Sequence, residues 1–304
     1  MMALIVAAAA TAATLPPGPL DFNAHDMRIE PKDHRVFLDG DVHLTRGDLN
    51  VTGDHAVADY KKQGTTKKAT KKAANYKAPQ AGEAVDHFTV DGKVHVQRGT
   101  RTADGDRGVL DVPGQTLVLT GTPAVPPVLR DGSETLSGDR ILLRLDSEDI
   151  DVVRPKLTLN RSLPAEGAPA GKTGSRVVVE AARLQLLKER HVAEFRDDVV
   201  VRRGDAVMKS PRLDARYDKD GQVTRLEMRG GVDLKQGDRR ATGQNADYDA
   251  LLKTMVLTGD PKLYDRGDVL SGDKIELALE TREVRVEKAK GRLHPEAHKE
   301  EGQQ

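Results

Sequence analysis

The hydrophobic residues of this chain alternate with polar residues in short runs, which is typical of half-buried β-strands. The clearest example lies between Met255 and Leu279, where alternating runs are bounded by Gly-Asp pairs, a dipeptide common in turns. Nearly the same sequence occurs earlier in the chain, as Leu117–Pro123 followed by Leu136–Leu145. A chain that repeats one strand-turn-strand pattern in this way is predicted to contain a duplicated β domain.

A shorter unit recurs in both halves of the chain. Gly40-Asp-Val-His-Leu-Thr-Arg-Gly47 has a near copy at Gly92–Gly99 and looser copies at Asp198–Gly204 and Gly231–Gly237. Turn signals return roughly every 12 to 16 residues. This spacing predicts strands of about eight to ten residues joined by short connections.

The N-terminal residues 1–19 resemble a secretory signal segment. An apolar run from Met1 to Thr14 ends in small residues, and Ala10-Thr11-Ala12 resembles a cleavage site. No basic residue precedes the run, which leaves a disordered Ala-rich tail as the alternative. The run is about a dozen residues long, too short to span a bilayer comfortably.

Three further segments interrupt the strand pattern and set the expected domain limits. Residues 61–82 are rich in Lys, Ala and Thr; the strand pattern resumes at Phe88, which favours a solvated insert over a nucleic-acid-binding element. Residues 161–175 are rich in Pro, Gly and Ala and are predicted to be a linker. We therefore expect domains at 20–160 and 176–291, followed by a charged tail at 292–304.

Composition narrows the function classes. The 304-residue chain has no Cys, which excludes disulfides, thiolate metal ligands and Cys nucleophiles. It has no Trp and only 3% aromatic residues, whereas carbohydrate modules and single-strand nucleic-acid binders usually need aromatic stacking platforms. The net charge of zero also argues against a general nucleic-acid-binding surface, so nucleic acid is not an expected partner.

A search for catalytic or metal-binding patterns gives no candidate. His43 and His95 occupy equivalent positions in two repeats, and alternation places both on the polar face, where a surface role is favoured over metal binding. The Gly-Asp pairs lack the spacing of β-roll or EF-hand calcium loops and are better explained as turns. There is no Gly-x-Ser-x-Gly motif and no phosphate-binding Gly loop. We expect no enzyme activity, no metal and no cofactor.

One face of successive strands is lined by aliphatic residues. Periodicity alone favours a plain β-sandwich core. The alternative is an open groove for an acyl chain, in which each buried CH2 contributes about 0.8 kcal/mol. The candidate lipid-binding residues are Val42, Leu44, Val94, Val96, Leu117, Leu119, Ile141, Leu143, Val199, Val201, Val232, Leu234, Met255, Leu257, Ile275, Leu277 and Leu279.

The motifs also follow a recognisable order in each half. They are Gly40–Gly47, Val118–Gly121 and Gly138–Ile141 in the first half, and Asp198–Gly204, Gly243–Asp249, Val256–Gly259 and Gly272–Ile275 in the second. This order resembles that of the LptA/OstA-like proteins of lipopolysaccharide transport over residues 20–160 and 176–290. Asp198 and Arg140 depart from the family pattern, which has Gly and Lys there.

The resemblance implies an all-β fold: a twisted, open antiparallel β-jellyroll, V-shaped and solenoid-like, in two tandem copies. It implies a periplasmic protein of a Gram-negative cell envelope that shields the lipid A acyl chains of lipopolysaccharide between the inner and outer membranes. The implied partners are other components with the same fold, joined by edge-strand pairing, and further copies of the chain stacked head to tail. The duplication and the insert depart from the short single-domain form.

Two other readings remain open. A self-assembling β-solenoid scaffold without a lipid ligand would share the repeats and the aliphatic interior. An enzyme would require a polar constellation that the sequence does not reveal. Lipid that co-purifies with the protein separates the first reading from lipid transport.

The sequence predicts that residues 61–82 are dispensable for folding. Deleting them should leave the melting temperature within a few degrees of the parent value, because loop-closure entropy changes only slowly with loop length. Thermal unfolding followed by circular dichroism measures this. A collapse in stability would show that the insert belongs to the core.

Overall fold

The computed structural model describes residues 2–3, 20–61, 84–160, 176–278, 281 and 283–292. The predictions for the signal-like segment, the Lys-rich insert, the linker and the charged tail lie outside the described residues, apart from Met2, Ala3, Lys61 and Arg292. Those predictions therefore stay predictions.

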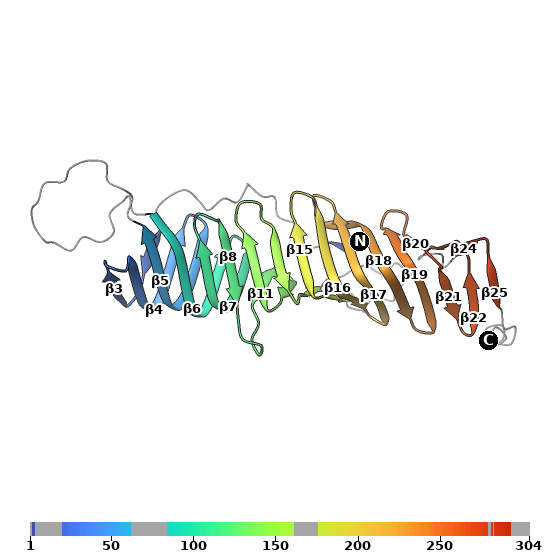
Figure 1. The fold of residues 1–304 in the computed structure, drawn as a ribbon, viewed down its shortest axis with the longest axis horizontal. Helices are drawn as coiled ribbons and strands as arrows, with labels where there is room; N and C mark the ends of the chain where they lie inside the picture. The colour runs from blue at the N-terminus through green and yellow to red at the C-terminus, as the bar shows by residue number, and fades with distance from the viewer. Residues whose placement is uncertain are drawn as a thin grey trace, which may run out of the picture. The chain divides into compact units, whose positions relative to one another are not determined.

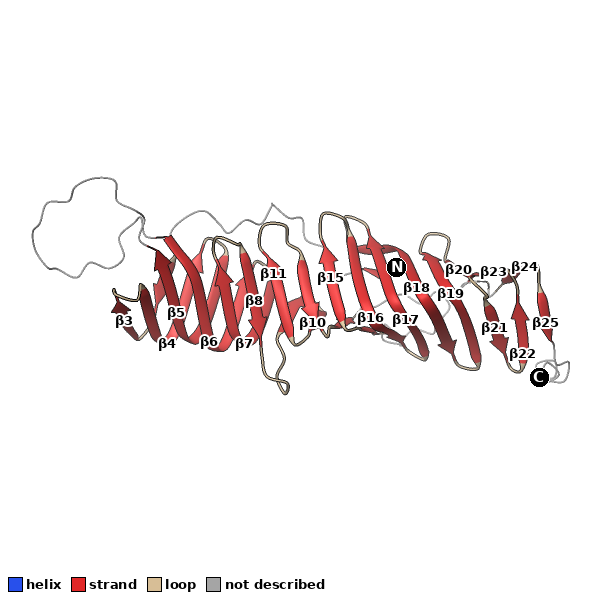
Figure 2. Ribbon diagram, viewed as in Figure 1, coloured by secondary structure: helices blue, strands red, loops and turns tan. Residues whose placement is uncertain are grey.

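The described residues form β-strands joined by turns and contain no helix, so none of them forms a helix suited to crossing a membrane (Figure 2). Every strand pairing described below is antiparallel, and the expected all-β antiparallel fold is confirmed (Figure 1). The strands are β1 (Met2–Ala3), β2 (Asp21–Asn23), β3 (Asp26–Glu30), β4 (Arg35–Arg46), β5 (Leu49–Lys61), β6 (Ala84–Arg98), β7 (Arg101–Asp111), β8 (Thr116–Thr120), β9 (Val128–Asp131), β10 (Glu134–Ser137), β11 (Arg140–Arg144), β12 (Ile150–Val153), β13 (Lys156–Leu159), β14 (Val177–Glu180), β15 (Arg183–Leu187), β16 (Val192–Arg203), β17 (Ala206–Tyr217), β18 (Gln222–Gln236), β19 (Arg239–Asp249), β20 (Thr254–Thr258), β21 (Lys262–Asp265), β22 (Asp268–Ser271), β23 (Lys274–Ala278), β24 (Val284–Glu287) and β25 (Lys290–Arg292).

The order of strand lengths repeats, so that β14–β25 reproduce β2–β13. The four long strands β4–β7 have 12, 13, 15 and 11 residues, and β16–β19 have 12, 12, 15 and 11. Six short strands follow each set. The predicted tandem duplication is therefore confirmed strand by strand, and we call these two sets the first and second repeats.

Each long strand bends near its middle. The pairing of β4 with β5 shifts between Asp39 and Val42, where Gly40 and Asp41 both adopt positive φ angles of 78° and 46°. The corresponding bend of β16 is made by Asp197 and Asp198, at 60° and 51°. Such bulges insert extra backbone and turn the strand, so each long strand contributes one half to each of two layers.

The bends correct the expectation of strands of eight to ten residues closed by Gly-Asp turns. Gly47-Asp48 does form a hairpin turn, since Arg46 pairs with Leu49. Gly40-Asp41, however, lies inside a strand of 12 residues. Because glycine adopts a positive φ equally well in a turn and in a bulge, the dipeptide alone does not separate the two.

The chain divides into two compact units, an N-terminal unit of residues 12–129 and 139–148 and a C-terminal unit of residues 1–11, 130–138 and 149–304. These limits differ from the expected domain limits, which follow the repeats. They differ because β12 and β13, the last strands of the first repeat, pair with β15 and β14 of the second repeat inside the C-terminal unit.

Each unit contains two layers, called A and B. In the N-terminal unit, layer A comprises residues 26–30, 35–39, 55–59, 87–91, 107–111, 116–120 and 140–144, and layer B comprises 21–23, 42–46, 49–52, 94–98 and 101–105. In the C-terminal unit, layer A comprises residues 150–153, 183–187, 192–196, 212–217, 222–229, 245–249, 254–258, 274–278 and 284–287, and layer B comprises 134–137, 156–159, 177–180, 199–203, 206–209, 232–236, 239–243, 262–265, 268–271 and 290–292.

The outer face of layer A in the C-terminal unit carries a ladder of ion pairs. Four carboxylates lie directly opposite one another on neighbouring strands, an arrangement that repels unless cations intervene. At Asp214 these cations are the guanidinium groups of Arg196 and Arg212, whose nitrogens lie 2.6 and 2.7 Å from the carboxylate oxygens. The four carboxylates belong to Glu194, Asp214, Glu227 and Asp247.

The ladder predicts a pH-dependent stability. Burial raises the pKa of Asp214, but hydrogen bonds from Arg212 and Arg196 outweigh burial and hold this pKa below its ordinary value. A carboxylate with a lowered pKa stabilises the fold above its unfolded-state pKa of about 4, and this contribution is lost as the pH falls through the folded-state pKa.

Asp214→Asn should therefore lower the melting temperature at pH 7 by several degrees, from a loss of about 1–3 kcal/mol. The gap from the parent should narrow and then close as the pH falls below the ordinary carboxyl pKa and through the lowered folded-state pKa of Asp214. The matched control is Asp26→Asn, at an exposed aspartate outside the ion pairs of the described residues. Equal shifts for the two variants, or a gap that persists in acid, would contradict the role of the ladder.

Candidate functional site

The candidate site is the face that the strands turn inward, between the two layers of each unit. Strand alternation places Val42 and Leu44 inward, at 0% and 3% exposure, whereas His43 between them is exposed. The same alternation holds on β16, where Val199 and Val201 are buried. The inward face is therefore aliphatic in both repeats.

The structure places every described member of the predicted set on this inward face. Leu143, Leu234 and Leu277 are partly exposed, and Leu279 lies outside the described residues. The buried members are Val42, Leu44, Val94, Val96, Leu117, Leu119, Ile141, Val199, Val201, Val232, Met255, Leu257 and Ile275. Their role in binding lipid stays a prediction.

Sequence reasoning missed the inward residues in the other halves of the long strands. Leu38, Phe88, Phe195 and Met228 are all buried, at 1–5% exposure. They follow the same alternation, but they lie on the far side of a bend, where the expected strand had already been ended by a turn. Phe88 and Phe195 add large aromatic side chains to the packing between the layers.

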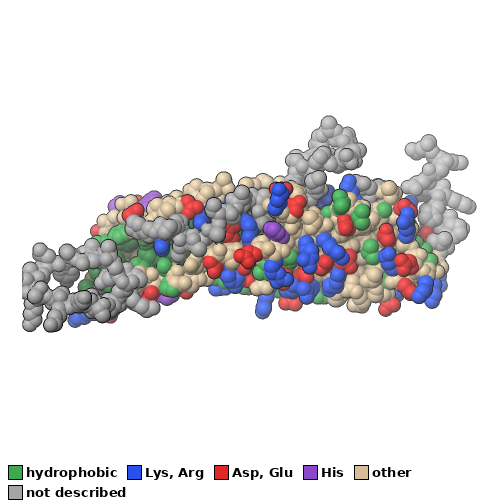
Figure 3. All heavy atoms as spheres, turned by 90° about the horizontal axis from the view of Figure 1, so that it is seen from above, with side chains coloured by type: hydrophobic (Ala, Val, Ile, Leu, Met, Phe, Trp, Pro, Cys, Tyr) green, Lys and Arg blue, Asp and Glu red, His purple; other side chains and the backbone are tan. Residues whose placement is uncertain are grey.

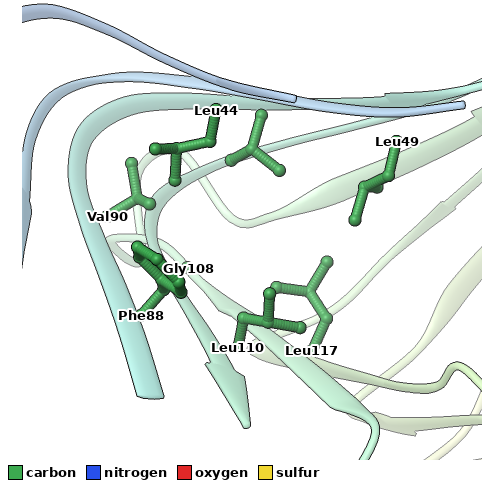
Figure 4. A pocket seen from close by; sticks show the side chains of 8 residues that line it. Leu44, Leu49, Phe88, Val90, Gly108, Leu110 and Leu117 are labelled. Atoms are coloured by element: carbon green, nitrogen blue, oxygen red, sulfur yellow. The ribbon is translucent and has the colours of Figure 1, made fainter. Parts of the chain in front are cut away.

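A small cavity lies in the interior of the N-terminal unit (Figure 4). Its volume is about 20 Å³ and its lining is entirely apolar. This is room for about one water-sized group, far less than an acyl chain needs. Figure 4 shows the side chains of Leu44, Leu49, Phe88, Val90, Leu110 and Leu117 around this space. The full lining is Leu44, Leu49, Val51, Phe88, Val90, Gly108, Leu110 and Leu117.

The apolar residues of the inward face become exposed to solvent on the last described strands of each sheet. Phe22 on β2 pairs with Leu44 and is 45% exposed, and Met27 on β3 pairs with Leu38 and is 49% exposed. Figure 3 shows apolar side chains at this end of the N-terminal unit. In the C-terminal unit, Val284 on β24 continues the row and is 37% exposed. Each unit thus has an end at which its apolar interior meets solvent.

The polar side chains form pairs rather than a reactive centre. His95 and Asp104 lie 2.7 Å apart, and His55 and Asp39 lie 2.9 Å apart, both on outward faces. His43 is exposed on the same outward face of layer B as His95. Within the described residues, no three His, Asp or Glu side chains are arranged to hold a metal ion.

Comparison with known families gives a match over most of the chain. Residues 22–149 and 178–283 match the model of the family described as LptA/(LptD N-terminal domain) LPS transport protein. The two matched segments correspond to the two repeats, apart from the final two strands of each, β12 and β13 in the first and β24 and β25 in the second.

Similar proteins include the LPS-assembly protein LptD of Pseudomonas syringae pv. syringae, 38% identical over 90 residues. LptD of Pseudomonas savastanoi pv. phaseolicola shows the same identity over the same length. The match covers 30% of this chain and only 10% of either relative. Among solved structures, LptH of Pseudomonas aeruginosa aligns with a TM-score of 0.37 and 20% identity, covering 39% of this chain and 95% of LptH.

Proposed function

The chain belongs to the LptA/LptD N-terminal domain family of lipopolysaccharide transport proteins, and we propose that it acts in the periplasm as a bridge that carries lipopolysaccharide toward the outer membrane. The acyl chains of lipid A would lie between layers A and B. The family is one of transport proteins, in agreement with the expectation that the chain is not an enzyme.

The observation that carries the proposal is the aliphatic inward face, which recurs in both repeats and reaches solvent at Phe22, Met27 and Val284. Each buried CH2 of an acyl chain contributes about 0.8 kcal/mol without any directional contact. A surface of this kind holds a hydrocarbon chain strongly overall while allowing it to move in small steps. Such binding suits transport better than a site with one decisive contact.

Lipid binding requires the layers to separate, because the interior is already packed. The strands are hydrogen-bonded to one another only within a layer. The two layers are connected by the bends of the long strands, such as the bend at Gly40 and Asp41. Separation therefore leaves the sheet hydrogen bonds intact and exposes mainly apolar side chains. An entering acyl chain covers those side chains again, so the exchange costs little net burial.

The chain contains its own example of the edge-strand pairing expected with partners. β12 and β13 end the first repeat and pair with β15 and β14 of the second. Their counterparts β24 and β25 end the second repeat, and within the described residues each pairs on one side only, with β23 and β22. At the other end, β3 and β2 likewise pair only with β4 among the described strands.

We infer that β24 and β25 accept β3 and β2 of a second copy, or the equivalent strands of a family partner. The internal junction supplies the register, because Val152 pairs with Leu184 and Leu157 with Val179. Transferring these pairs to the equivalent strands places Val286 opposite Met27, and Gly291 opposite Phe22. A residue without a side chain would then face the largest exposed inward one.

The alternative function is a self-assembling scaffold that binds no lipid, and the packed interior favours it, because this interior excludes water without a ligand. Both functions use the same strand pairing at the junction, and they differ only in whether lipid is bound. The next experiment therefore tests the lipid path directly.

A photoreactive p-benzoylphenylalanine in place of Phe22 should crosslink to lipopolysaccharide, because the side chain lies at the exposed end of the inward row. Met27→Asp in the same protein should reduce crosslinking roughly tenfold, since an unpaired carboxylate is costly to place against acyl chains. The measurement is the fraction of crosslinked protein on a denaturing gel.

The matched control is Val125→Asp, which places the same charge on a loop residue of the same unit that is 62% exposed. It should leave crosslinking unchanged, and circular dichroism checks that all variants fold. Absence of crosslinking in the folded parent, or equal loss in the two Asp variants, would favour the scaffold.

A second test addresses edge pairing. The N–H of Ala278 donates to the carbonyl of Glu283, and antiparallel pairs alternate, so the N–H of Val284 points away from β23 toward the open edge. Val284→Pro should therefore weaken concentration-dependent self-association at least tenfold by removing an outward donor. Sedimentation velocity over a range of concentrations measures the effect.

Val284→Ala is the control, because it shortens the side chain and keeps the N–H. It should weaken association less than the proline variant. Arg285→Pro would instead remove a donor directed at β23 and should lower the melting temperature. Association that is unchanged in Val284→Pro would rule out pairing through β24.

A further inference from the structure

The outer face of layer B in the C-terminal unit is strongly basic. Eight Lys and Arg residues point outward there, all exposed, against two acidic residues, Glu180 and Asp233. We call this surface the basic face. Its cations are Lys156, Arg202, Lys209, Lys235, Arg240, Lys262, Lys290 and Arg292.

Ion pairing neutralises only part of the basic face. Glu180 pairs with Arg202 at 2.6 Å and lies 3.6 Å from Lys156, and Asp233 pairs with Arg240 at 2.9 Å. The remaining five cations take part in no ion pair within the part of the chain that the structure describes. They are Lys209, Lys235, Lys262, Lys290 and Arg292.

The first repeat provides an internal comparison, because its layer B has the same strands and pairing. The equivalent outward positions on β4–β7 hold neutral residues: Thr45, Thr52, Gln97 and Thr102 stand where the second repeat has Arg202, Lys209, Lys235 and Arg240. The fold therefore does not require the charges. A function confined to the C-terminal unit explains them better.

We propose that the basic face binds an anionic phospholipid surface. Its cations are spread over strands from β13 to β25 and do not converge on one point, as donors for a single phosphate would. Most are lysines, which act as point charges without a fixed binding geometry. Half-buried aliphatic residues, Val178, Val200 and Val207, lie among them. An extended cationic surface of this kind matches the charge of a bilayer leaflet.

This binding is independent of the proposed lipid path, because the basic face points outward and the path lies between the layers. Its role would be to hold the C-terminal unit beside a membrane.

The test is co-flotation of the full chain with vesicles made of equal parts phosphatidylcholine and phosphatidylglycerol. The parent should bind these vesicles and not vesicles of phosphatidylcholine alone. The triple variant Lys209→Thr, Lys235→Gln and Lys262→Gln should bind about a hundredfold more weakly, because each basic residue near an anionic surface contributes about 1 kcal/mol. Raising the salt from about 0.01 M to about 1 M should also release the protein.

The matched control carries Lys32→Gln, Lys93→Gln and Lys219→Gln, which remove the same number of lysines at exposed positions that do not belong to the basic face. It should bind nearly as the parent does, and the lysines of residues 61–77 are present in every protein compared. Equal weakening of the two triple variants, or equal binding to neutral vesicles, would overturn the proposal. So would the absence of vesicle binding by the parent, even where crosslinking to lipopolysaccharide succeeds.

Discussion

The bend in the long strands is the constraint on which the rest of this structure depends. A long strand that continues through a bulge places one half in each layer. In both halves inward apolar side chains alternate with outward polar ones. On alternate long strands the bend is made by two successive residues with positive φ, such as Gly40 and Asp41 on β4 and Gly230 and Gly231 on β18. Glycine meets this need without strain, and aspartate tolerates it better than most residues.

Much of the fold could be predicted from alternation and repetition. The all-β class, the duplication and the inward direction of residues such as Val42 and Leu257 follow from a period of two and from near-identical motifs. The strand lengths could not be predicted, because Gly40-Asp41 and Gly47-Asp48 have the same sequence while one bends a strand and the other reverses the chain. Leu38 lies beyond the bend at Gly40-Asp41 and is not among the predicted inward residues for this reason. The exposed ends at Phe22 and Val284 depend on which strands lack neighbours, a property of the whole sheet.

The packed interior and the transport role are compatible if the protein exchanges one set of apolar contacts for another. A permanently open aliphatic groove would expose a large apolar surface and would invite aggregation. The packed state avoids this, and the half-exposed ends at Phe22 and Met27 provide places where exchange can begin. The outer faces contribute differently, since ion pairs such as that of Arg196 with Asp214 stabilise layer A from outside.

The junction of β12 and β13 with β15 and β14 has a consequence for the durability of any assembly. Two repeats that share one polypeptide cannot dissociate, because a separated junction remains tethered at a high effective concentration and closes again. A row built from such chains would contain a breakable joint after every second repeat, whereas a row of single-repeat proteins would contain one after every repeat. Duplication therefore halves the number of points at which the row can part, without strengthening any single contact.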